Sequence, residues 1–326
     1  MSEFAIPSQT YSWMYARAAV SQLSGLRCFG IRGADSLVAV APLLEVGDWL
    51  RELPALYEPG DLIWSDSDAL AELASLLAAQ PQPVYLERVP VNSPTRLALR
   101  RAYAGKGIIL ERPAMPTPFI NLNECDGNID ATFNAIRRSD FRRAERKAGE
   151  FGMLTYELHA PNSITELASL MNEVHAVEAA SWKEQEGSSL TANTWQGNFF
   201  HHFTQGAMLA GILRIAIMRI SGQAVAIQVA VEWQQRFWLF KISYDQHFSR
   251  CSPGQLLMLY TLRYAAQEVL QSYEFMGVMS PWTAYWTKQT RSYVQLRAIP
   301  FSIATGKHLV RWGGRSILSG FRRVLA

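Results

Sequence analysis

Apolar residues gather into short runs around glycine-containing turns at two places in the chain, residues 26–44 and 213–233. The first stretch turns at Gly33 and the second at Gly222, with β-branched and other apolar residues on both sides. This pattern predicts an antiparallel hairpin at each place. After the second hairpin, residues 236–245 (RFWLFKISYD) predict a third strand of the same meander.

A segment of helical periodicity precedes each hairpin, at residues 11–22 and 164–180. A helix followed by an antiparallel meander, found twice, predicts a tandem duplication of one α/β unit. Chance similarity is the alternative, because hairpins are common. We expect an α/β (α+β) fold with mixed, mostly antiparallel sheets flanked by helices, divided into units at 1–155 and 156–305 and a basic tail at 306–326.

Further predicted elements fill both units. Leucines recur on one face of a helix at 67–79, and further helices are expected at 94–105 and 129–149. Strands are expected at 83–90, 117–122, 153–159, 273–276 and 292–300.

The composition is typical of a globular protein, since 49% of the 326 residues are hydrophobic and 18% are charged. Cys28, Cys125 and Cys251 lie far apart without metal-binding or CxxC spacing, which favours a reducing compartment. The beginning MSEFAIPSQTY has neither the basic nor the apolar region of a secretory signal. Arg214 and Arg219 interrupt the most apolar stretch, so no segment reaches the about 20 apolar residues of a membrane span. We therefore expect a cytoplasmic protein.

The net charge of +3 is unevenly distributed. No acidic residue follows Glu274, and the eight basic residues beyond it leave the first 274 residues with a charge of 3 − 8 = −5. The tail 306–326 predicts an amphipathic basic helix, weakened by internal glycines. Such a helix either lies on an anionic membrane surface, at the inner face of the membrane, or docks on the body of the protein.

A helix is predicted to begin after Cys251, in the sequence Ser252-Pro253-Gly254-Gln255. Serine is a good N-cap, proline suits the first helical position, and the S-x-x-Q spacing predicts a capping box. Gly254 leaves no side chain over the first turn, so an anion could reach the free backbone N–H groups. A plain capped helix and an anion site are both consistent with this start.

Six arginines and lysines fall within residues 137–147. Arg138, Arg142 and Arg146 are spaced i, i+4, i+8 and form one ridge, although like charges at this spacing cost roughly 0.2–0.5 kcal/mol per pair. The ridge indicates either a contact with an anion (CoA, a lipid-linked phosphate or RNA) or a solvated helix face.

Three motifs follow one another in the second unit: E-x-x-SWK from Glu178 to Lys183, YD…SPGQLL from Tyr244 to Leu257, and Y-E-F-x-G from Tyr273 to Gly277, followed by WTK. Together they resemble the bacterial GNAT-type acyltransferases, in particular the cellulose- or exopolysaccharide-biosynthesis acetyltransferase-like group. This group is related to the Fem peptidyltransferases, which carry two tandem GNAT units. The resemblance covers residues 10–300 and is strongest from Arg137 onward. Glu274 stands where Asp is usual, and MSPWTAYWTK is longer than the usual connection.

The resemblance implies acyl transfer from acetyl-CoA or another acyl-CoA to an amine or hydroxyl of a sugar-, peptide- or lipid-type acceptor. The first unit would then be a scaffold and acceptor wall, and the second would bind the donor. Ser252, Gly254 and Gln255 would contact the donor diphosphate, together with Lys288, although the family's R-x-x-G-x-G/A loop is absent.

The same resemblance implies direct transfer, in which backbone N–H groups polarise the donor carbonyl and a base removes the acceptor proton. Candidates for the base are Asp245, His247 and Glu178. Asp245 could instead cap a turn, and the other two could be solvated. No metal site is expected, because His175 and the His201-His202 pair lack partners at metal spacing.

Substrate contacts are expected from aromatic and basic residues of these motifs, and packing or solvation is the alternative for each. They are Trp182, Lys183, Tyr244, Trp286, Arg138 and Arg142. A buried thiol is favoured over a nucleophile for Cys251. Two other functions stay open. One is a Fem-like peptidyltransferase that takes aminoacyl-tRNA on the basic helix, and the other is a non-catalytic module for polysaccharide synthesis.

Overall fold

A computed structural model describes residues 6–21, 24–53, 58–181 and 194–301. The first half contains η1 (Pro7–Gln9), α1 (Tyr11–Val20), β1 (Leu26–Arg32), β2 (Leu37–Val46), β3 (Trp49–Glu52), β4 (Ile63–Trp64), α2 (Ser67–Ala78), β5 (Val84–Pro90), α3 (Thr95–Ala102), β6 (Gly107–Asn121), η2 (Ile129–Thr132) and α4 (Ala135–Gly149). The second half contains β7 (Leu154–His159), α5 (Ile164–Ala179), α6 (Trp195–Leu209), β8 (Leu213–Ile220), β9 (Gln223–Trp233), β10 (Arg236–Tyr244), η3 (Gln246–Cys251), α7 (Pro253–Gln267), β11 (Ser272–Glu274), α8 (Pro281–Trp286) and β12 (Thr290–Pro300).

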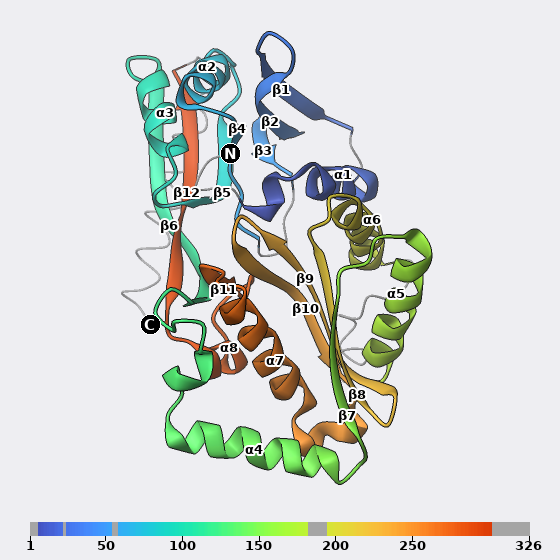
Figure 1. Cartoon of the computed structure of the whole chain (residues 1–326). Helices are drawn as coiled ribbons and strands as arrows, with labels where there is room; N and C mark the ends of the chain where they lie inside the picture. Colours follow the sequence, from blue (N-terminus) through green and yellow to red (C-terminus); the bar gives the residue numbers. More distant parts are fainter. Residues whose placement is uncertain (1–5, 22–23, 54–57, 182–193, 302–326) are drawn as a thin grey trace, which may run out of the picture.

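These elements repeat one plan twice, which confirms the predicted tandem α/β fold (Figure 1). The meander β1-β2-β3 leads through α2 to β5, which runs parallel to β3. The meander β8-β9-β10 leads through α7 to β11, which runs parallel to β10. Each unit then adds a short helix, α3 or α8, and one long strand, β6 or β12.

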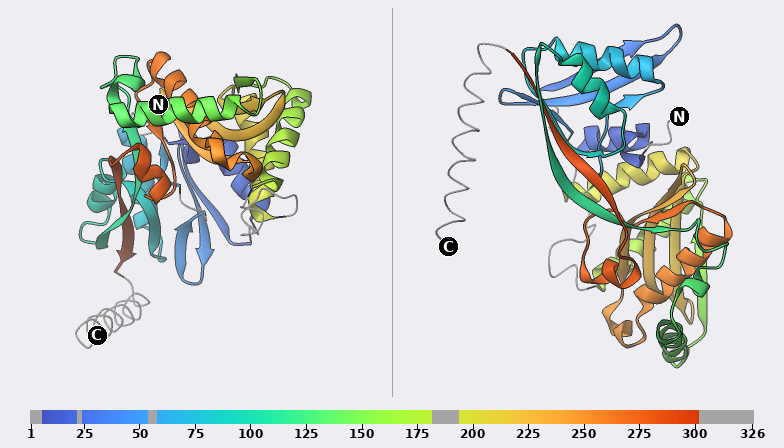
Figure 2. Two further views of the ribbon diagram at one scale, coloured as in Figure 1. Left: turned by 90° about the horizontal axis from the view of Figure 1, so that it is seen from below. Right: turned by 90° about the vertical axis from the view of Figure 1, so that its left-hand side faces the viewer.

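The two units exchange their last strands. The order is β1-β2-β3-β5-β12-β6-β11-β10-β9-β8-β7, with β4 on β2, so β12 of the second half lies beside β5 and β6 of the first. β6 in turn reaches β11 through Phe119–Asn121. Figure 2 shows β6 and β12 running side by side from one half to the other. A boundary near residue 155 therefore divides the chain but not the sheet.

The strand β6 is much longer than the predicted strand at 117–122. The first part was missed because it contains Pro113 and Pro116, and proline removes a backbone donor and argues against a central strand. Among the described residues, β12 covers one edge of this part, and β11 joins the other edge only from Phe119 onward. The prolines are tolerated because that second edge is open.

Helices cover both faces of the second half of the sheet (Figures 1 and 2). α5 and α6 pack on one face, where α1 of the first half joins them through Trp13, which contacts Phe199 and Phe203 edge-on. α7 packs on the other face, and α4 lies across it. Burial from both sides explains the nearly continuous apolar runs of β8 and β9. None of the helices in the described ranges combines the length and apolarity that a bilayer crossing requires.

Candidate active site

The strands β10 and β11 separate after a short contact. They pair only at residues 236–238 with 272–274, and among the described residues no strand pairs with the edge of β10 beyond that point. A β-bulge interrupts the pairing of β10 with β9 at Phe240. A bulge leaves a residue outside the ladder and re-aims its neighbours. Among the described residues, the edge of β10 beyond Trp238 is therefore not paired with a neighbouring strand, and we call it the open edge.

The bulge also brings two consecutive side chains to the same face of β10. Phe240 packs against Trp13 and Phe203, on the side of α1 and α6. Lys241 lies on the side of α5, where its Nζ is 3.1 Å from Oε1 of Glu178. The two charged side chains are 7% and 2% exposed. This buried ion pair lies beside the separation of β10 and β11.

Lys241 is a residue that the sequence reasoning missed. A signal was present, because a lysine in the apolar run LFKIS is rarely buried unless it is paired. Glu178 was a candidate base, and the structure gives it a buried position on α5 in place of a solvated helix face. Trp182 and Lys183, predicted to follow it, lie outside the described residues.

Asp245 and His247 lie at the far end of β10. Asp245 Oδ1 accepts from the His247 backbone N–H at 2.9 Å, so the alternative of a turn cap is confirmed, and it is 2.8 Å from His247 Nδ1. The carboxylate is buried, whereas the imidazole is 86% exposed. The Gln246 N–H donates to the Ala180 carbonyl at 3.1 Å and ties this turn to the end of α5. An imidazole held by a carboxylate at Nδ1 leaves Nε2 free to take a proton.

The start of α7 differs from the predicted capping box. Ser252 has a left-handed backbone, with φ of 52°, and its side chain caps nothing. Its carbonyl instead accepts from the N–H groups of Gln255 at 2.9 Å and Leu256 at 3.2 Å. The capping-box prediction is wrong because this conformation turns the hydroxyl away from the first turn. Gln255 is exposed, so its side chain does not close the box.

Gly254 has a packing role at this start. A Cβ there would lie 3.2 Å from Cδ1 of Tyr244, so the tyrosine ring lies against the glycine. Within the described part of the chain, the Gly254 N–H has no acceptor. The N-terminal end of α7 is thus covered by Tyr244 on one side, yet Ser252 and Gly254 both remain partly exposed. A diphosphate at this tip stays a prediction.

Two other predicted contacts lie elsewhere. Lys288 is exposed in the link between α8 and β12. Trp286 is only 7% exposed and stacks on Phe141 at a centroid distance of 5.5 Å, so little of it is left for a substrate. Cys251 is buried, and burial raises its pKa, which disfavours the nucleophilic thiolate.

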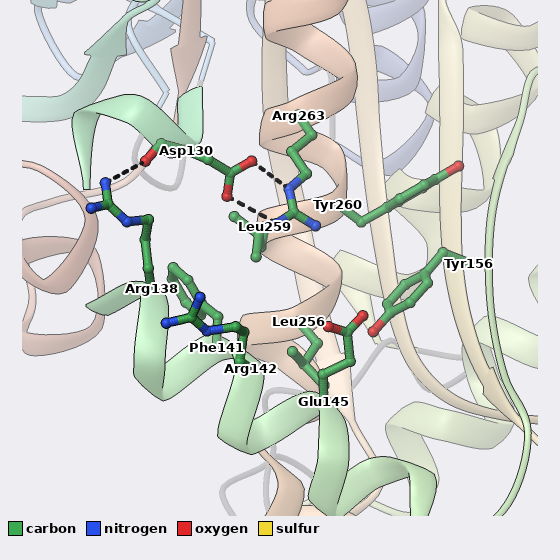
Figure 3. A pocket seen from close by; sticks show the side chains of 10 residues that line it. All are labelled: Asp130, Arg138, Phe141, Arg142, Glu145, Tyr156, Leu256, Leu259, Tyr260 and Arg263. Atoms are coloured by element: carbon green, nitrogen blue, oxygen red, sulfur yellow. Dashed lines mark hydrogen bonds and ion pairs between the residues drawn. The ribbon is translucent and has the colours of Figure 1, made fainter. Parts of the chain in front are cut away.

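Arg138 and Arg142 lie together at a pocket of about 280 Å³ between α4 and α7 (Figure 3). Residues of α4, α7, β7 and η2 line it: Asp130, Arg138, Phe141, Arg142, Glu145, Tyr156, Leu256, Leu259, Tyr260 and Arg263. Asp130 holds Arg263 through two hydrogen bonds of 2.8 and 2.9 Å. In the ranges the structure describes, no cluster of three or more His, Cys, Asp and Glu could hold a metal ion.

Residues 135–283, somewhat less than half of the chain, match the family model described as the acetyltransferase (GNAT) domain. The matched segment contains β10, β11, the bulge and α7, so the similarity to the acetyltransferase (GNAT) domain covers the part of the chain that carries the candidate site. No curated protein has a sequence that matches the chain.

Solved structures resemble nearly the whole chain. The C-terminal domain of a protein from Agrobacterium fabrum named as a lysylphosphatidylglycerol synthetase has a TM-score of 0.58 at 10% identity, over 91% of this chain and 90% of that one. L-PGS from Bacillus licheniformis has a TM-score of 0.56 at 13% identity, over 91% and 92%. FemX has a TM-score of 0.56 at 12% identity, over 91% and 93%. At these identities the likeness establishes the shared fold.

Proposed function

We propose that the protein transfers an acyl group, in the first instance acetyl, from an acyl-CoA to an amine or hydroxyl of a sugar-, peptide- or lipid-type acceptor. One observation carries the proposal: among the described residues, no strand pairs with β10 beyond its short contact with β11, β10 is bulged at Phe240, and α7 begins just beyond the end of this strand. The match of residues 135–283 to the acetyltransferase (GNAT) domain supports the same reaction.

The donor would lie along the open edge of β10. Its carbonyl would accept hydrogen bonds from backbone N–H groups of this edge, which are directed at the oxygen before negative charge develops there. Its diphosphate would lie toward the start of α7, where the Gly254 N–H and the helix dipole favour an anion. Tyr244 would flank the chain that joins these two ends.

Proton removal from the acceptor is assigned to His247, which Asp245 holds through Nδ1. The acceptor nitrogen or oxygen attacks the thioester carbon, and its proton passes to Nε2 of His247. The C–S bond then breaks, and the protonated Nε2 gives this proton to the leaving CoA thiolate, which departs as the thiol. The pair of Glu178 and Lys241 would hold the wall of the site, because a buried pair at 3.1 Å fixes α5 against β10. Neither role requires a covalent enzyme intermediate.

A second function, aminoacyl transfer from aminoacyl-tRNA, is favoured by the arginines of α4. Arg138 and Arg142 lie on one helix ridge, and among the described residues no carboxylate is paired with either. Phosphate contacts by such a ridge dominate the binding of nucleic acids. FemX and the lysylphosphatidylglycerol synthetase domain share the fold, so aminoacyl-tRNA is included among the donors to be tested.

Thermal denaturation of the full chain with acetyl-CoA, longer acyl-CoAs and aminoacyl-tRNA separates these functions. A ligand that binds only the folded state at 100 times its Kd should stabilise it by about 2.7 kcal/mol. Stabilisation by CoA thioesters but not by the corresponding free carboxylic acids supports the proposal. Stabilisation by aminoacyl-tRNA alone, weakening steeply with salt, replaces it by the second function. The third alternative, a non-catalytic module for polysaccharide synthesis, predicts that none of these donors binds.

The role of His247 is tested separately, with acyl-CoA and a panel of amine and hydroxyl acceptors. His247→Gln keeps a polar side chain but removes the proton acceptor, so kcat should fall by about 10²–10⁴ with donor affinity unchanged. His201→Gln, at an exposed position of α6, is the matched control. An unchanged kcat in His247→Gln removes this residue from the mechanism.

A further inference from the structure

The pocket between α4 and α7 has the surfaces that a phosphorylated nucleoside requires. Its floor is apolar, formed by Phe141 of α4 with Leu256 and Leu259 of α7. One wall is aromatic, because Tyr156 and Tyr260 stack at a centroid distance of 5.4 Å and an interplanar angle of 22°. Figure 3 shows these side chains arranged around the same hollow as the guanidinium groups of α4. A nucleobase gains from contact with apolar and aromatic side chains.

The arginines around this pocket differ in the ion pairs and hydrogen bonds that they make with other residues of the protein. Asp130 neutralises Arg263 through a bidentate contact. Arg138 donates to the backbone carbonyl of Phe133 at 2.7 Å, which orients its guanidinium without neutralising the charge. Arg142 has neither a hydrogen bond nor an ion pair within the described residues. Two uncompensated guanidinium groups, one turn apart on the same helix, therefore remain for an anion.

The pocket continues the proposed donor path. Leu256 belongs to the first turn of α7, two residues after Gly254. Tyr260 follows Gly254 by six residues, a rise of about 9 Å along the helix. A nucleoside attached to a diphosphate at the tip of α7 can reach that far along the helix. Glu145, at the rim, can accept a hydrogen bond from an exocyclic amino group of the base.

We infer that the pocket between α4 and α7 binds the 3′-phosphorylated adenosine of the acyl donor, with Arg138 and Arg142 on the phosphate and the base against the apolar floor. The identity of the ligand rests on the proposed function, since CoA carries this nucleotide. The pocket itself is defined by Phe141, Tyr260 and the two arginines. It gives α4, which connects the two units, a part in donor binding.

The test uses isothermal titration of the full chain with adenosine 3′,5′-bisphosphate, CoA and dephospho-CoA, which lacks the 3′-phosphate. Arg142→Ala should weaken the first two by roughly tenfold or more, the effect of a lost hydrogen bond between charged groups, and leave dephospho-CoA unchanged. Arg143→Ala is the matched control. It removes the same charge from the same helix, but Arg143 pairs with Asp140 at 2.8 Å and does not line the pocket.

Equal affinity of CoA for the parent chain and Arg142→Ala overturns the inference. So does equal weakening by Arg142→Ala and Arg143→Ala, which would indicate only a general charge effect. If a CCA trinucleotide binds in place of adenosine 3′,5′-bisphosphate, the ridge is an RNA site and the inference fails.

The two proposals can fail independently. Binding of adenosine 3′,5′-bisphosphate that depends on Arg142, without acyl transfer from any acyl-CoA, keeps the pocket and rejects the function. Acyl transfer from acyl-CoA with a KM that Arg142→Ala does not change keeps the function and rejects the pocket. Thermal unfolding of Arg142→Ala and Arg143→Ala, followed by circular dichroism, checks that both variants remain folded.

Discussion

Replacing Lys241 by methionine tests whether the buried ion pair holds α5 against β10. Methionine keeps a long unbranched side chain, so the change removes the charge with little change in volume. Glu178 would then be a buried carboxylate, 2% exposed, without the ammonium now 3.1 Å from it. At that distance two unit charges attract by about 5 kcal/mol with an effective dielectric constant of roughly 20. Most of this attraction offsets the cost of removing the charges from water.

Loss of one partner is therefore more costly than loss of both. Breaking a buried pair typically destabilises a protein by about 3–5 kcal/mol, whereas replacing the whole pair by neutral groups is often close to neutral. Lys241→Met should lower the free energy of unfolding by about 3–5 kcal/mol, and adding Glu178→Gln should restore most of it. The measurement is urea unfolding at pH 7 followed by circular dichroism.

An exposed pair on the same protein supplies the comparison. Arg143 and Asp140 are 64% and 41% exposed, so Arg143→Met should cost less than about 1 kcal/mol. If Lys241→Met costs no more than this control, or if the double variant loses the sum of the two single changes, the pair does not act as argued. Donor affinity measured on the same variants distinguishes a folding effect from a local effect on the site.

Three further changes test other parts of the fold. Burial raises the pKa of Asp61 to about 6, so ionised Asp61 lowers the free energy of unfolding by about 3 kcal/mol above that pH, and this loss disappears as the pH falls toward 4. In urea unfolding from pH 4 to 8, Asp61→Asn should remove this pH dependence, and an unchanged dependence of the free energy of unfolding on pH would contradict the assignment. Ser252→Gly should stabilise the chain by about 1 kcal/mol in thermal unfolding, because glycine adopts the left-handed conformation of this residue without strain and the serine side chain caps no helix. A loss of stability would indicate that the serine hydroxyl makes a stabilising contact. Asn134→Ala should cost about 1 kcal/mol in the same assay, because Asn134 accepts from the Arg137 N–H at 2.8 Å at the start of α4, and no change would mean that solvent replaces this cap.

Local patterns predicted most of the secondary structure. The hairpins β1-β2 and β8-β9, and the helices α2 and α5, lie within a residue or two of the predicted ranges, because their hydrophobic periodicity and their turns are short-range properties. The helix predicted at 129–149 is divided into η2 (Ile129–Thr132) and α4 (Ala135–Gly149). Predictions from local sequence rules were wrong where contacts with distant parts of the chain allow a conformation that the rules disfavour. The prolines of β6 are allowed by an open sheet edge, and Ser252 is held in a left-handed turn that no capping pattern describes.

The candidate site was predictable only in part. The contact between Asp245 and His247 was within reach of the sequence, because the two residues are two positions apart and directly follow a strand. Lys241 and Glu178 are 63 residues apart, and only the bulge at Phe240 turns Lys241 toward α5. The charge of the ridge on α4 was evident from its spacing, but the pocket it borders exists because α7 packs across it.

The sequence by itself determined most of the elements, the repeated α/β plan and the chemical groups available for the proposed acyl transfer, because periodicity, turn chemistry and charge are properties of neighbouring residues. The tertiary structure alone decided that the units exchange β6 and β12, that β10 and β11 separate, and that α4 lies across α7. These features depend on contacts between residues far apart in the chain. Their free energy comes from burying surfaces of whole elements, which no local pattern specifies.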